Sequence, residues 1–69
     1  MNVERVLNIV LMELSADKLK AEEELESAIN ESIDIDIKVL KIKTILNRIS
    51  MAESNLARFT SLSENNKKQ

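Results

Sequence analysis

The chain has 69 residues, a net charge of −2, a single aromatic residue, and no Cys, His, Gly or Pro. These absences exclude disulfides, thiolate metal sites, glycine-rich phosphate loops and the commonest general base. Without aromatic platforms or a basic stripe, nucleic acid is not an expected partner either. We therefore expect one small non-enzymatic domain without catalytic residues, cofactor or metal, whose 43% apolar content points to protein partners.

Residues 3–12 form an apolar opening segment that Glu4 and Asn8 interrupt. The segment lacks a basic leader and a small-residue cleavage site, and it is far too short to span a bilayer. We therefore expect a packed helix rather than a signal peptide, in a cytoplasmic protein that makes no membrane contact.

A seven-residue apolar repeat predicts two long helices in one domain over residues 1–62. The expected helices are 2–30 and 35–61, with a turn within 30–34 and a polar, disordered tail at 63–69. Ser32 or Asp34 is expected to cap the second helix. The repeat contains Leu7, Leu14, Ala21, Ala28, Ile35, Ile42, Ile49 and Leu56, with a companion row of Leu11, Lys18, Leu25, Ser32, Val39, Leu46 and Glu53.

The segment Ile33–Val39 alternates apolar and polar residues, which is also the pattern of a half-buried strand. No second alternating run exists to pair with it, and a lone strand is not stable. The helical interpretation is preferred, and the strand is its alternative.

Charge along the chain predicts how the helices pair. Residues 17–31 are mostly acidic, whereas every charged residue from Lys38 to Arg48 is basic. A parallel pairing would juxtapose like charges, so an all-α antiparallel hairpin is expected, formed within one chain or by helix exchange between two. Folding near residue 31 pairs apolar residues whose numbers add up to 63, namely Leu7–Leu56, Leu14–Ile49, Ala21–Ile42 and Ala28–Ile35. The same fold sets the acidic residues of the first helix beside the basic residues of the second, namely Glu22, Glu23, Glu24 and Glu26 beside Lys38, Lys41 and Lys43.

This pairing leaves apolar residues on the outer faces of both helices, and such surfaces usually mark interfaces. A simpler interpretation is that some of them pack in the turn and others are singly exposed. The expected partner is an amphipathic helix, a helical-repeat chaperone or a second copy of the chain. The candidate partner-binding residues are Ile9, Met12, Ile33, Ile37 and Leu40.

Other functions fit the residues less well. The acidic run Glu22–Glu26 has no His to complete a metal or acid/base site, so a solvated face pairing with Lys is expected. Asp34 and Asp36 lack the glycine and spacing of a calcium loop. A DNA-reading helix over Lys38–Arg48, or an acidic mimic of nucleic acid, is a weaker alternative.

Three segments together resemble the small co-chaperones of type III secretion needle subunits: apolar Val3–Leu14, acidic Lys18–Glu31 and Ile-rich Ile35–Ile49. The resemblance is one of architecture across roughly residues 2–60 and carries over no individual residue. It implies a cytoplasmic hairpin that docks onto a tetratricopeptide-like partner and keeps a needle subunit monomeric. The alternative is a homo-oligomeric coiled coil or four-helix bundle, structural or regulatory, of viral or plasmid type.

Overall fold

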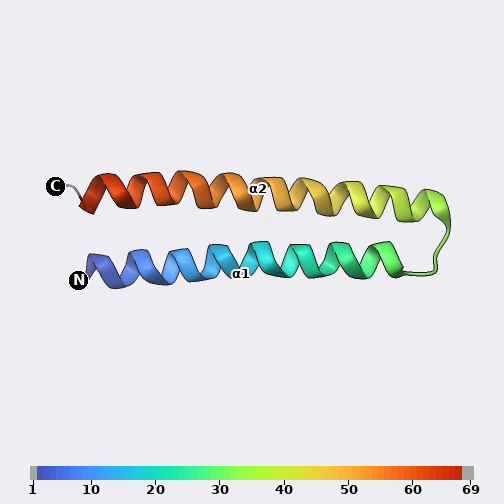
Figure 1. Ribbon diagram of the computed structural model, residues 1–69, viewed down its shortest axis with the longest axis horizontal. Coiled ribbons are helices and arrows are strands. Elements are labelled where there is room, and N and C mark those ends of the chain that lie inside the picture. The colour runs from blue at the N-terminus through green and yellow to red at the C-terminus, as the bar shows by residue number, and fades with distance from the viewer. Residues whose placement is uncertain (1, 68–69) are drawn as a thin grey trace.

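The computed structural model describes residues 2–67 as two helices, α1 (Val3–Asn30) and α2 (Ile35–Lys67), joined by residues 31–34 (Figure 1). The helices run antiparallel, side by side, in a rod of 53 × 15 × 14 Å. The predicted all-α hairpin is thereby confirmed, and the chain folds back on itself. Residues 35–39 begin α2, so the strand alternative is wrong. Neither helix, over the described residues, has a stretch long and apolar enough to cross a membrane.

Side chains cap both helices near their N-termini. The Asn2 Oδ1 atom accepts a hydrogen bond of 3.1 Å from the Arg5 backbone N–H, which starts α1. Asp34 does the same for α2, because its Oδ2 atom accepts from the Asp36 N–H at 3.2 Å. Asp34 is one of the two caps that the sequence predicts. These bonds satisfy backbone donors that have no partner within the helix.

The second helix is longer than expected. It continues through Lys67, whereas we expected it to end at residue 61 and a disordered tail to begin at 63. The sequence after residue 61 is polar but contains neither Gly nor Pro, so no residue there forces the helix to stop. Residues 68–69 of the expected tail lie outside the described part of the chain.

The pairing of the two helices differs from the expected register. Three ion pairs join them, Lys18–Glu53, Glu24–Arg48 and Glu31–Lys41, among the residues that the structure describes. The paired numbers add up to 71, 72 and 72 instead of 63, so α2 is displaced along α1 by about 13 Å. In this register two basic residues seven positions apart, Lys41 and Arg48, pair with two acidic residues that have the same spacing, Glu31 and Glu24. The predicted pairing of Glu22, Glu23 and Glu26 with Lys38 and Lys43 is wrong.

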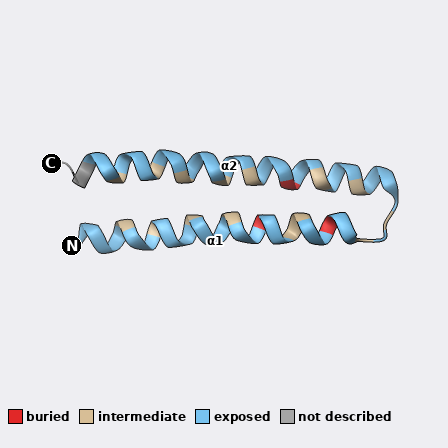
Figure 2. Cartoon of the chain, viewed as in Figure 1, coloured by how far each residue is buried: buried red, intermediate tan, exposed pale blue. Residues whose placement is uncertain are grey.

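The shift changes which residues of α2 face α1. Ile45 is 4% exposed, whereas Leu46, which was expected in the seam, is 46% exposed and Ile35 is 73% exposed. The α2 side of the seam thus follows an i, i+3, i+7 pattern, and the predicted companion row of Val39, Leu46 and Glu53 is wrong. On α1, Ala21 and Ala28 are buried, and their small side chains let the helices approach closely (Figure 2). The half-buried apolar residues of the α2 seam are Ile42, Ile49, Ala52, Leu56 and Phe59.

We expect Ile45→Ala to destabilise the hairpin by about 2 kcal/mol or more, since it removes the one large buried side chain of the seam. Leu46→Ala removes a similar volume from the neighbouring, solvent-exposed position and should cost much less. Urea unfolding followed by far-ultraviolet circular dichroism measures both free energies. Equal losses would place Leu46 in the seam and contradict the observed register.

Candidate protein-binding surfaces

The hairpin leaves most of its large apolar side chains in contact with solvent. Only Ala21, Ala28 and Ile45 are buried among the described residues, and no large side chain there is completely covered. The fourteen exposed large apolar residues are Val3, Val6, Ile9, Leu11, Met12, Leu19, Ile29, Ile35, Ile37, Val39, Leu40, Leu46, Met51 and Leu62. Apolar exposure on this scale is typical of a surface that another protein covers.

The closed end of the hairpin carries an open groove because α2 begins beyond the end of α1. The Glu31 backbone is extended, so the connection continues outward before the chain turns back (Figure 1). Lys41 is the residue of α2 that lies beside Glu31. The six residues of α2 before Lys41 therefore extend about 9 Å along the helix axis beyond the level of Glu31. The resulting end groove has a volume of about 620 Å³ and is lined by Glu24, Ser27, Ala28, Ile37, Leu40, Lys41, Thr44, Ile45 and Arg48.

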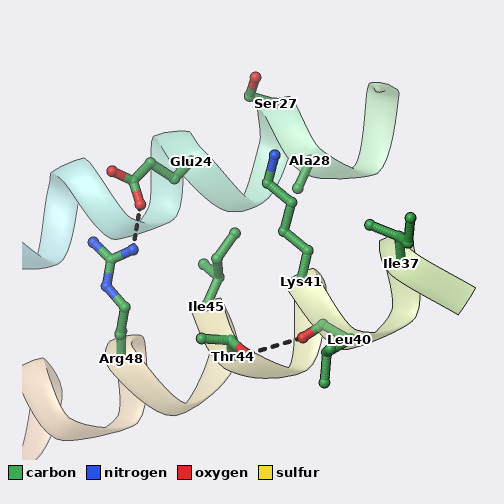
Figure 3. Close-up of a pocket in the computed structure, with 9 residues that line it drawn as sticks. All are labelled: Glu24, Ser27, Ala28, Ile37, Leu40, Lys41, Thr44, Ile45 and Arg48. Atoms are coloured by element: carbon green, nitrogen blue, oxygen red, sulfur yellow. Dashed lines mark hydrogen bonds and ion pairs between the residues drawn. The ribbon is translucent and has the colours of Figure 1, made fainter. Parts of the chain in front are cut away.

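The floor of the end groove is apolar. Ala28 of α1 and Ile45 of α2 point toward each other across the seam, with Ile37 farther along toward the turn (Figure 3). The Thr44 hydroxyl donates a hydrogen bond of 3.0 Å to the Leu40 backbone carbonyl, so that polar group is already satisfied within α2. An apolar floor of this kind favours an apolar ligand over a polar one.

Charged side chains border the groove. The Arg48 guanidinium bonds the Glu24 carboxylate across the seam (Figure 3). The Lys41 Nζ atom lies 2.8 Å from Glu31 Oε2. The Arg48 hydrogen bond holds the pKa of Glu24 below its ordinary value, because it favours the ionised carboxylate. Both pairs are partly exposed, so their role is to fix the register more than to add stability.

The structure divides the five predicted partner-binding residues into two surfaces. Ile37 and Leu40, which are 60% and 68% exposed, both line the end groove, although Leu40 points away from α1 (Figure 3). Ile33 is half-buried in the connection next to this end of the hairpin. Ile9 and Met12 lie in the first half of α1, where Met12 is about 24 Å along the helix from Ala28. A single small ligand cannot contact both surfaces.

Sequence reasoning missed the floor and the border of the groove. Ile45 belongs neither to the predicted seam nor to the predicted binding surface, and the predicted pairing does not join Arg48 to Glu24. The signal was present, because Glu24 and Glu31 have the same seven-residue spacing as Lys41 and Arg48. Among the described residues, no cluster of His, Cys, Asp or Glu side chains could hold a metal ion.

No family model, curated protein or solved structure matches this chain.

Replacing Glu24 with Gln should reduce the loss of stability at acidic pH. The folded pKa of Glu24 lies below its ordinary value, so the pair with Arg48 stabilises the hairpin above about pH 4.5 and this contribution disappears as the pH falls further. Thermal melting from pH 7 to pH 3 should show a shallower acid decline for Glu24→Gln than for the parent chain.

Glu22→Gln is the matched control for this comparison. It removes the same charge from α1 at an exposed position that makes no ion pair among the described residues. An equally shallow decline in the Glu22 variant would show that the effect comes from overall charge and not from the contact with Arg48.

Proposed function

We propose that this chain is a cytoplasmic helix-binding module whose end groove receives an amphipathic helix of another protein. The observation that carries the proposal is the imbalance of burial: among the described residues three are buried, whereas fourteen large apolar side chains are exposed. Residues 2–67 form only the two helices and their connection, so no further element among them covers these side chains. An added helix would turn the two-helix layer into a three-helix packing unit, which is a common way for helical proteins to complete a core.

The groove matches an amphipathic helix in chemistry as well as in shape. Ala28 and Ile45, which are 1% and 4% exposed, form the base of the groove, while Ile37, which is 60% exposed, supplies apolar contact area. The charged side chains of Lys41 and Arg48 lie at the border, where they can contact polar residues along the edge of the same partner helix. Apolar residues spaced i, i+3, i+4 and i+7 on the partner would fill the floor.

Masking the apolar face of a helix is the activity of a co-chaperone or assembly partner. A protein whose helix is held in the groove cannot use the same face for its own aggregation. A type III secretion needle subunit is one candidate for this partner, on the basis of the architectural resemblance described above. The groove itself selects only a class of ligand, an amphipathic helix.

Ile37→Asp should weaken binding of the partner at least tenfold while the helix content is kept. The substitution places a charge on the apolar wall that the partner helix would have to cover, whereas Ile37 makes little contact within the hairpin because it is 60% exposed. A photo-crosslinking amino acid at position 37 identifies the partner in cells, and isothermal titration with the purified partner then measures the dissociation constant.

Met51→Asp is the control, because Met51 is 66% exposed on the same helix but does not line the end groove. It should bind the partner with the affinity of the parent chain. An unchanged dissociation constant for Ile37→Asp would show that the groove is not the binding surface. Capture of a second copy of this chain at position 37 would also contradict the proposal.

A further inference from the structure

A second surface runs along the face of α1 that is turned away from α2. Here Ile9, Met12 and Leu19 are 47%, 71% and 58% exposed, whereas Leu7 and Leu14 face α2 and are half-buried. At about 100° per residue, Met12 lies roughly on the opposite side of the helix from Leu14. The outer stripe consists of Arg5, Ile9, Met12, Ala16, Leu19 and Glu23, all of them exposed.

The spacing of the outer stripe is that of a coiled-coil seam. Successive members are separated by four, three, four, three and four residues, the alternation that keeps side chains on one face of paired helices. The first helix therefore has two seams, one facing α2 and one facing solvent. A helix with apolar residues on both sides is the pattern of a helix packed between neighbours.

The outer stripe is complementary to an antiparallel copy of itself. Positions 5 and 23, 9 and 19, and 12 and 16 each add up to 28, so an antiparallel second copy of α1 would bring these positions together in pairs. Ile9 would then pack on Leu19 and Met12 on Ala16. At each end of the stripe Arg5 of one chain would lie beside Glu23 of the other, which gives two ion pairs between the chains.

A parallel pairing of the same stripe would be repulsive. It would place Arg5 against Arg5 and Glu23 against Glu23 at the two ends. Neither residue belongs to an ion pair within the described part of the hairpin, so both are available for contacts between chains. A two-fold axis near residue 14 also gives an isologous interface, the commonest arrangement of homodimers.

We propose that the occupant of the outer stripe is a second copy of this chain, paired antiparallel through α1 across a two-fold axis near residue 14. The dimer places the two first helices at its centre and the two second helices outside. This surface is independent of the end groove, because the groove is formed by the last turns of α1 and the first turns of α2. Loss of one proposed interaction therefore leaves the other measurable.

Sedimentation equilibrium of the full chain over a hundredfold concentration range tests the dimer. The parent chain should fit a monomer–dimer equilibrium. Arg5→Glu or Glu23→Arg alone should raise the dimer dissociation constant roughly tenfold, since each change replaces two attractive contacts with two repulsive ones. The double variant Arg5→Glu/Glu23→Arg restores opposite charges at both ends and should return close to the parent value.

One further variant tests the position of the axis. Glu13 lies on the flank of the stripe, one residue from the proposed two-fold axis, so two copies of this carboxylate would lie near each other in the dimer. Glu13→Gln removes that repulsion and should tighten the dimer about twofold. An axis elsewhere would leave the dissociation constant unchanged, which would contradict the proposed alignment.

Two controls separate this interface from other associations. Each variant should retain the helix content of the parent chain in circular dichroism, and Ile37→Asp should leave the dimer dissociation constant unchanged. A monomer at all concentrations would overturn the proposal. So would a dimer that the single charge changes do not weaken, or that the double variant fails to restore, because both results would indicate another interface or a parallel pairing.

Discussion

Two helices that pack against each other can cover only one face each, and the rest of this protein follows from that constraint. The seam between α1 and α2 buries Ala21, Ala28 and Ile45, and within residues 2–67 no third element covers the other faces. Burial of apolar surface is the main favourable term in folding, so a hairpin with so small a core is marginal by itself. The two associations that we propose would each bury further apolar surface of the rod.

The register of the seam determines where the uncovered surface lies. Because Glu24 and Glu31 meet Arg48 and Lys41, the second helix extends past the end of the first, and Ile35 and Ile37 in its opening turns are 73% and 60% exposed. The apolar groove at the closed end thus accompanies the register that the ion pairs at its border join. The outer stripe of α1 arises differently, from a second heptad pattern within the same helix. The two proposed associations are compatible in one assembly, because a dimer paired through the outer stripe would present two end grooves to partner helices.

Much of the fold could be predicted because its causes are local. A chain without Gly or Pro and with a seven-residue apolar repeat favours long helices, and the cap at Asp34 follows from a short polar side chain before an apolar run. The choice of an antiparallel pairing also follows from the order of charges. The end of the second helix differs from the prediction because a polar composition is typical of disorder, although polar residues such as Asn65 continue a helix that has already formed.

The candidate surfaces could be predicted only in part. The sequence singled out Ile37 and Leu40 as unpartnered, but not the floor at Ile45 or the border at Arg48, which belong to the groove only in the observed register. By itself the sequence determined two helices, their antiparallel direction and an excess of apolar surface, since these depend on local propensity and on the order of charges. Only the tertiary structure decided the register. A repeating seam offers several nearly equivalent alignments, and the choice among them depends on side chains from both helices fitting together at the same time.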